Sequence, residues 1–311
     1  MIDMTKTKSA FIAIVGRPNV GKSSLLNQII GQKVAIVTPK PQTTRTNILG
    51  IHTEGDTQLV FVDTPGLHLP KTKLGKSMVG SVSQGLADTE CCILVADAAG
   101  AIPKKGGEIH IGKAELELIE RLKKMGIPAV LALNKIDLVA DKAQLLPIVQ
   151  AYNDLFSFEK VYLISAKNGK GTDELLKNML SYAVLSPWFY DADALTDQTE
   201  RVLAAETVRE KLLFALDKEI PHGVAVVVEK YHERENIVDI EVTVFCERET
   251  HKGIIIGKNG AVLKSVGTRA REDMEQMLQK KVNLQIWVKV REDWRNKETM
   301  VRSFGFNTGK M

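Results

Sequence analysis

The chain has 311 residues, 44% hydrophobic and 26% charged, a mixture typical of a soluble globular protein of about two domains and not of a disordered or membrane-spanning one. Its polar start, MIDMTKTKSA, lacks the apolar segment of a secretory signal. Although the net charge is only +4, residues 251–311 hold 13 Lys and Arg against 6 Asp and Glu. We therefore expect a cytoplasmic protein without a transmembrane segment, whose C-terminal part favours a phosphate-rich partner.

The first predicted elements are a strand over residues 11–15, a glycine-rich loop and a helix. The sequence GRPNVGKSS has the Gly-x-x-x-x-Gly-Lys-Ser spacing of a P-loop in its strand-loop-helix setting. Loop N–H groups and the helix N-terminus can wrap phosphates, Lys22 can reach the β and γ oxygens, and the Ser23 hydroxyl can hold Mg²⁺. The expected nucleotide contacts of this loop are Gly16, Arg17, Pro18, Asn19, Val20, Gly21, Lys22, Ser23 and Ser24.

Two further pieces of a phosphate site follow. The polar segment VTPKPQTTRTNILGI predicts a mobile loop whose threonine hydroxyl reaches Mg²⁺ when a γ-phosphate is bound; Thr44 is the expected ligand and Thr43 the alternative. The apolar run QLVFV ends at Asp63, which would also hold Mg²⁺. The Gly66 N–H would sense the γ-phosphate. The expected nucleotide contacts here are Asp63, Thr64, Pro65 and Gly66, and the expected catalytic set is Lys22, Thr44, Asp63 and Gly66.

The identity of the base is indicated by VLALNKIDL, an apolar run that ends at Asn134, Lys135 and Asp137. A carboxylate at Asp137 can accept from the guanine N1–H and exocyclic amine. Adenine lacks this donor pair, and an unpaired buried carboxylate costs more than the roughly 1–3 kcal/mol of an unsatisfied polar group. The motif therefore favours GTP over ATP. A loop at the end of a later strand can close over the base through Ser165, Ala166 and Lys167.

Together these four motifs resemble those of the P-loop GTPases. Strands alternate with helical stretches over residues 11–185, which predicts an α/β domain with a mainly parallel sheet and helices on both faces. The EGD at residues 54–56 separates two strand-like runs, so one strand pair is expected to be antiparallel.

One departure concerns hydrolysis. Leu67 stands where signalling GTPases carry the glutamine that orients water, so unassisted hydrolysis should be slow. In some GTPases with a hydrophobic residue there, the asparagine corresponding to Asn19 helps hold a potassium ion, and the resemblance implies the same ion here.

The second half of the chain predicts a smaller α+β domain. A helix should begin after Thr199, followed by two strands joined by a charged turn, a helical or extended ETHKGIII, a glycine turn, a helix from about residue 261 to 281, a strand in NLQIWVKVRE and a closing helix. The expected division is an N-terminal tail (1–9), a GTP-binding domain (10–185), a linker (186–199) and an RNA-binding domain (200–311).

The glycine turn is GKNG, in which Gly257 and Gly260 lack a Cβ and let another backbone come close. A Gly-x-x-Gly turn between two helices, backed by a small sheet, resembles the type II KH module, which clamps about four nucleotides of single-stranded RNA or DNA by the backbone. The resemblance implies RNA contacts at Gly257, Lys258, Asn259, Gly260 and Lys264.

A GTPase with PQTTR and DTPGLH motifs followed by one KH module resembles the Era family of bacterial GTPases over residues 10–300. That resemblance implies GTP and GDP as ligands and recognition of the 3′ end of small-subunit ribosomal RNA on the assembling small subunit. It also implies a protein that is partly peripheral at the inner face of the cell membrane.

Two other functions compete with this interpretation. One is a membrane-surface regulatory GTPase whose basic C-terminal domain docks on anionic lipid. Lys264, Arg269 and Arg271 support it, but the same stretch carries acidic residues and lacks the Trp or Phe face of an interfacial helix. The other is an RNA chaperone insensitive to GTP, which is disfavoured because every nucleotide-contacting position is intact.

Overall fold

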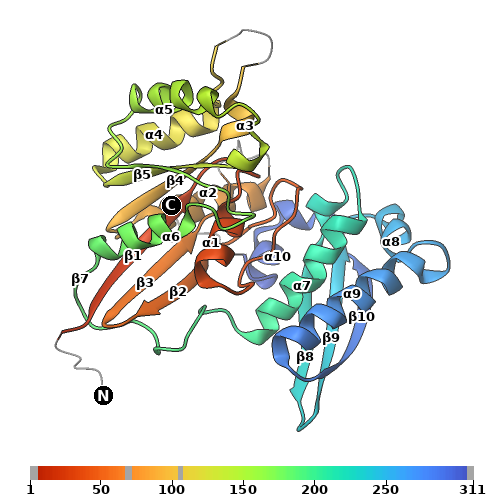
Figure 1. Cartoon of the computed structure of the whole chain (residues 1–311). Helices are drawn as coiled ribbons and strands as arrows, with labels where there is room; N and C mark the ends of the chain where they lie inside the picture. Colours follow the sequence, from red (N-terminus) through yellow and green to blue (C-terminus); the bar gives the residue numbers. More distant parts are fainter. Residues whose placement is uncertain (1–5, 67–71, 104–107, 307–311) are drawn as a thin grey trace. The chain divides into compact units, whose positions relative to one another are not determined.

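The computed structural model describes residues 6–66, 72–103 and 108–306 (Figure 1). The chain forms two compact units, of which the first contains Met1–Ala35, Thr44–Leu69 and Met78–Asp197 and the second contains Ile36–Thr43, Pro70–Ser77 and Gln198–Met311. The division at 197/198 falls within the expected linker. Segments 36–43 and 70–77 fall in the second unit, although the sequence division placed them in the first domain.

Alternating strands and helices build the first unit. In chain order its elements are β1 (Lys8–Val15), α1 (Lys22–Ile30), β2 (Ile48–Glu54), β3 (Thr57–Asp63), α2 (Lys73–Leu86, whose first residues belong to the second unit), β4 (Cys91–Asp97), α3 (Ala98–Ala101), α4 (Lys113–Met125), β5 (Ala129–Asn134), α5 (Leu145–Asn153), β6 (Val161–Leu163), α6 (Thr172–Met179) and β7 (Val184–Leu185). β1 thus begins two residues before the expected boundary at residue 10.

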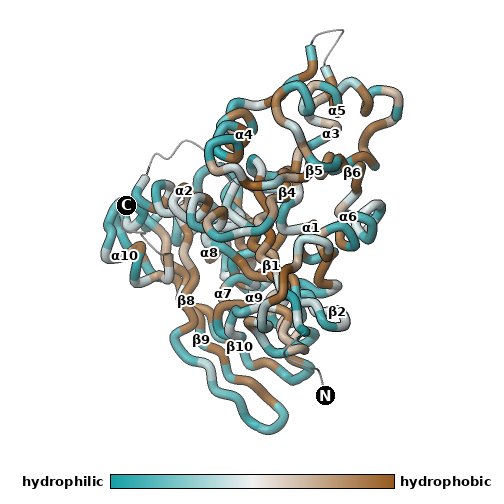
Figure 2. The backbone as a smooth tube through the Cα atoms, turned by 90° about the vertical axis from the view of Figure 1, so that its left-hand side faces the viewer, coloured by the Kyte–Doolittle hydropathy of each residue, from teal (hydrophilic) through white to brown (hydrophobic). Residues whose placement is uncertain are grey.

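The seven strands form one sheet with the order β2-β3-β1-β4-β5-β6, and β7 pairs antiparallel with the start of β1. β2 and β3 are also antiparallel, as the EGD turn predicted, and the pairs β3–β1, β1–β4, β4–β5 and β5–β6 are parallel. Ile12 and Ile14 face a hydrophobic core with α1 and α6, whereas Ala13 and Val15 face a second core with α4 and α5. Figure 2 shows the hydrophobic character of β1, β4 and β5. The predicted mainly parallel sheet with helices on both faces is confirmed.

The topology brings the ends of four strands to one edge of this sheet. β1, β3, β4 and β5 are parallel, and their carboxyl ends are Val15, Asp63, Asp97 and Asn134. In open α/β sheets, ligands bind in the crevice outside the carboxyl ends of the strands. The loops that carry the nucleotide motifs therefore start from the same edge.

The second unit contains a three-stranded sheet of order β10-β9-β8, with β8 and β9 antiparallel and β9 and β10 parallel. Val208 and Leu212 of one helix and Val266 and Met274 of another form a hydrophobic core with this sheet. The predicted order of helix, two strands, two helices and strand is confirmed. Its elements are α7 (Glu200–Ala215), β8 (Ala225–Glu233), β9 (Ile237–Cys246), α8 (Glu249–Ile256), the 3-10 turn η5 (Lys258–Gly260), α9 (Ala261–Leu278), β10 (Lys281–Val290), the 3-10 turn η6 (Trp294–Asn296) and α10 (Glu298–Ser303).

Among the described residues, no helix is both long enough and apolar enough to cross a membrane.

Candidate nucleotide site and nucleic-acid interface

The loop after β1 carries Lys22 into the interior of the first unit. α1 begins at Lys22, so the N–H groups of its first turn lack intrahelical acceptors and can bind an anion. The Lys22 ammonium donates to the carbonyl oxygens of Gly16 and Arg17, at 3.2 Å each, and burial lowers the pKa of Lys22. A buried ammonium beside free helix N–H groups is suited to a phosphate.

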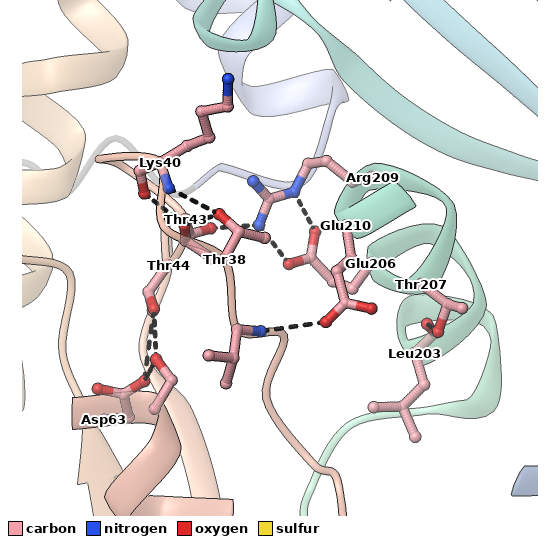
Figure 3. A network of polar contacts seen from close by, with 12 residues as sticks. Thr38, Lys40, Thr43, Thr44, Asp63, Leu203, Glu206, Thr207, Arg209 and Glu210 are labelled. Carbon is pink, nitrogen blue, oxygen red and sulfur yellow. Dashed lines mark hydrogen bonds and ion pairs between the residues drawn. The ribbon is translucent and has the colours of Figure 1, made fainter. Parts of the chain in front are cut away.

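Three oxygen atoms from separate segments converge next to this loop. The Ser23 hydroxyl donates to Asp63 Oδ2 at 2.6 Å and lies 2.9 Å from Thr44 Oγ1, which is 3.4 Å from the same carboxylate oxygen (Figure 3). Burial raises the pKa of Asp63 to about 6, against the attraction of Lys22. Asp63 Oδ1 is buried and has no hydrogen-bond partner among the described residues. This cluster of hard oxygens with an orphaned carboxylate atom fits a divalent cation.

The two threonines of the polar loop have different surroundings. The Thr43 hydroxyl lies 2.7 Å from Thr38 Oγ1 and donates to the Lys40 carbonyl at 2.7 Å, so it stays within its own loop. Thr44 instead points toward Asp63 (Figure 3). Of the two candidates, the structure brings Thr44 to the oxygen cluster.

The expected base-binding residues are held together by hydrogen bonds, of which the two made by Asn134 are buried, whereas Asp137 is exposed. Asn134 Nδ2 donates to the Val20 carbonyl at 2.8 Å, and its Oδ1 accepts from the Ala166 N–H at 2.9 Å. Asp137 Oδ1 accepts from the Ser165 hydroxyl at 2.7 Å. Asn134 therefore fastens the P-loop and the Ser165–Lys167 loop to the same strand end, and Ser165 orients the carboxylate that would read the base.

Sequence reasoning missed Asp97, which lies at the end of β4. Its Oδ2 accepts from Lys135 Nζ at 2.8 Å, and the same lysine donates to the Asn19 carbonyl at 2.7 Å. Arg17 lies 3.8 Å from Asp97 and pairs through Nε with the buried Glu115 at 3.4 Å. The signal was available, because CCILVAD ends in an aspartate at a strand terminus, as QLVFVD does.

The second phosphate motif lies against the P-loop. The Thr64 hydroxyl donates to the Ile14 carbonyl at 2.9 Å. A Cβ on Gly66 would lie 2.7 Å from the backbone of Pro18, so this approach is open only to glycine. Leu67, on which the expectation of slow hydrolysis depends, lies outside the described residues.

In the second unit, the GKNG turn joins α8 to α9. Gly257 has φ 74° and ψ 172°, and a Cβ there would lie 2.5 Å from Val262 Cγ2. At Gly260, with φ 76° and ψ 9°, a Cβ would have no atom of the described residues within 4 Å. Gly257 therefore permits the fold of the turn, whereas Gly260 leaves space beside the N-terminus of α9. Lys258 and Lys264 are exposed next to it.

Two regions of the sequence match known family models. Residues 11–135 match a family described as 50S ribosome-binding GTPase, and residues 219–295 match the KH domain. The GTPase Era of Ruminiclostridium cellulolyticum is 44% identical over 304 residues, which cover 97% of this chain and 99% of that protein. The GTPase Era of Syntrophus aciditrophicus is 46% identical over 302 residues, which cover 96% of this chain and 95% of that protein.

Solved structures agree with the sequence relatives. An Aquifex aeolicus Era variant bound to GDP and AlF4⁻ matches with a TM-score of 0.89 and 36% identity, over 96% of this chain and 99% of that one. Era in complex with MgGDPNP and nucleotides 1506–1542 of 16S ribosomal RNA matches with the same TM-score, identity and coverage. The chain is thus more than 40% identical to these two relatives over almost the whole of both proteins, and it therefore belongs to the GTPase Era family.

Proposed function

We propose that this GTPase couples a guanine-nucleotide switch to a single-stranded RNA clamp and acts on the 3′ end of small-subunit ribosomal RNA during assembly of the small subunit. The observation that carries the proposal is the match over 96% of the chain to Era in complex with MgGDPNP and a 16S ribosomal RNA fragment. Because the match spans both units, it supports the nucleotide and the RNA parts of the proposal together.

In the nucleotide part, Gly16 to Ser24 wrap the phosphates with backbone N–H groups and Lys22 neutralises the β and γ oxygens. Asp137 accepts the two guanine donors, and Ser165 holds this carboxylate in place. Loss of the hydrogen bonds of Asn134 would release the P-loop from the base side of the site.

Magnesium would be held by Ser23, Thr44 and Asp63, the three residues whose side-chain oxygens converge. A Mg²⁺ ion held there would supply positive charge next to the phosphates of the nucleotide. The residues of the chain supply the oxygen atoms, exclude water around Asp63 and keep Lys22 beside the phosphates. The proposal also includes a potassium ion held beside Asn19. If this ion is present, kcat should be higher in KCl than in NaCl of equal concentration.

For RNA, the open side of Gly260 admits the sugar-phosphate backbone, and Lys258 and Lys264 add positive charge. The charge of the last 61 residues would also attract anionic lipid, so partial association with the inner membrane surface is part of the proposal and needs its own test.

The test compares wild type with Gly260→Asp, which fills the open side of the turn with a carboxylate. In filter binding with RNA of nucleotides 1506–1542 of 16S ribosomal RNA, the variant should lose most of its affinity while GTP binding stays at the wild-type level. Wild-type RNA affinity in the variant would refute the clamp. Vesicles of phosphatidylglycerol, titrated in parallel, should bind both proteins within about twofold; parallel loss of vesicle binding would favour the lipid function instead.

A further inference from the structure

The segment of residues 36–43 packs within the second unit, although the residue that follows it belongs to the nucleotide site. Thr44, directly after this segment, contributes its hydroxyl to the oxygen cluster with Ser23 and Asp63. Because a single peptide bond joins Thr43 to Thr44, a displacement of Thr43 also moves Thr44, the proposed cation ligand.

Two adjacent residues of α7 bind the backbone at the two ends of this segment. Arg209 Nη2 donates to the Thr43 carbonyl, and Glu210 Oε1 accepts from the Val37 N–H at 3.2 Å (Figure 3). Arg209 and Glu210 are 1% and 3% exposed, so water cannot easily replace either contact. These contacts fix where the segment begins and where it ends.

Arg209 is itself held in place. Glu206, one helical turn earlier, accepts from its Nε at 2.7 Å and from Nη2 at 2.5 Å, the two-pronged geometry that orients a guanidinium. Inside the segment, Lys40 N donates to Thr38 Oγ1 at 3.2 Å and the Thr43 hydroxyl donates to the Lys40 carbonyl, which closes a compact turn. The segment is thus a folded loop carried by α7 and not a loose connection.

α7 also leads to the GKNG turn. It packs on α9, which begins directly after that turn, and Lys211 of α7 pairs with Asp273 of α9 at 2.5 Å. A continuous route therefore runs from Thr44 through Thr43, Arg209, α7 and α9 to the turn.

We propose that Arg209 and Glu210 are positioning residues that set the location of Thr44, so that α7 couples the cation and γ-phosphate site to RNA binding. The RNA half of this inference rests on the proposed function, whereas the positioning half does not. Thermodynamic linkage requires the coupling to act in both directions: if GTP changes the RNA affinity by some factor, RNA changes the GTP affinity by the same factor.

The first experiment needs no RNA. Arg209→Gln should lower kcat by about tenfold and raise the Mg²⁺ concentration for half-maximal hydrolysis by a similar factor, because it removes one charge-assisted hydrogen bond. The affinity for GDP should be unchanged. Arg209→Lys, which keeps the charge, should recover part of the loss, and Glu210→Gln should have a smaller effect because its amide oxygen still accepts from Val37.

The matched control is Arg201→Gln on the same helix, because the Arg201 guanidinium binds the carbonyl oxygens of Val228 and Glu229 and not the loop. This variant should keep the wild-type kcat and Mg²⁺ requirement. A folded Arg209→Gln protein with wild-type kcat and Mg²⁺ requirement would overturn the positioning role, as would equal losses in Arg209→Gln and Arg201→Gln.

The second experiment measures the coupling. RNA of nucleotides 1506–1542 is titrated into each protein in its GDP and its MgGDPNP form, and the ratio of the two Kd values should move toward one by at least about threefold in Arg209→Gln. An unchanged ratio would refute the coupling. If wild type bound this RNA in neither form, the proposed RNA function would fail, and the RNA-free kinetics would still decide the positioning role.

Discussion

Replacing each glycine of the GKNG turn by alanine should have sharply different effects on the second unit. Gly257→Ala puts a methyl group 2.5 Å from Val262 Cγ2 and 3.0 Å from the Val262 backbone nitrogen, at φ 74° and ψ 172°. Gly260→Ala puts its methyl group in open space, at φ 76° and ψ 9°. The two changes add the same atoms to positions three residues apart, so each serves as the other's control.

The magnitudes follow from these geometries. A side chain in the backbone region of Gly257, which is essentially restricted to glycine, costs about 1–3 kcal/mol, and the steric overlap adds about 1–3 kcal/mol. At Gly260 the left-handed helical conformation alone costs about 1–2 kcal/mol. We therefore expect Gly257→Ala to destabilise the turn and its helices by about 2–3 kcal/mol more than Gly260→Ala, or roughly 30- to 160-fold in the opening equilibrium.

A local readout suits a chain of two units, because one global unfolding transition is not guaranteed. Native-state hydrogen exchange, measured by mass spectrometry on peptides from α8 and α9, should show faster exchange in Gly257→Ala by the factor above. Peptides from β4 and β5 should be unchanged in both variants. Equal acceleration in α8 and α9 by the two alanines would show that the contact with Val262 does not restrict Gly257, and the separate roles of the glycines would be wrong.

Three further predictions concern other groups. Asp137→Asn should weaken GTP binding and favour xanthosine triphosphate, whose extra carbonyl accepts from the new amide; an unaltered preference for GTP in competition binding would contradict the base assignment. Lys258→Ala should lower the slope of log K against log salt for single-stranded RNA by about 0.7 without changing the preferred sequence, and an unchanged slope would remove Lys258 from the phosphate contacts. Because burial raises the Asp63 pKa from 3.8 to about 6, the folded metal-free protein binds more protons than the unfolded chain between these values, so its stability should fall as pH rises. Asp63→Asn should therefore raise the Tm of the Mg²⁺-free protein more at about pH 7.5 than at about pH 5; an equal increase at both would mean that Asp63 does not titrate in this range.

Local patterns predicted most of the architecture from the sequence. The P-loop spacing, the strand ends at Asp63 and Asn134 and the helix start after Thr199 are all local signals, because each depends on a few neighbouring residues. β7 was not predicted, since a two-residue strand carries no alternation. The place of residues 36–43 in the second unit was also missed, because the contact of Arg209 with Thr43 joins positions 166 residues apart and leaves no periodic pattern in either segment.

The pairing of β7 with β1 has a consequence for synthesis on the ribosome. Thr7 and Ser186 exchange hydrogen bonds at 3.0 and 3.1 Å. These contacts beside β1, the first strand to be synthesised, can therefore form only after nearly all of its own unit has been made. The hydrogen bonds of the Gln58 amide also form late, because their partners are the backbone groups of Phe189 and Tyr190. The nucleotide unit can complete its sheet only after β7 has left the exit tunnel, and it can bind the Gln58 amide only after Tyr190 has emerged. The loop before Thr44 acquires its α7 partners some twenty residues later, when Arg209 and Glu210 emerge.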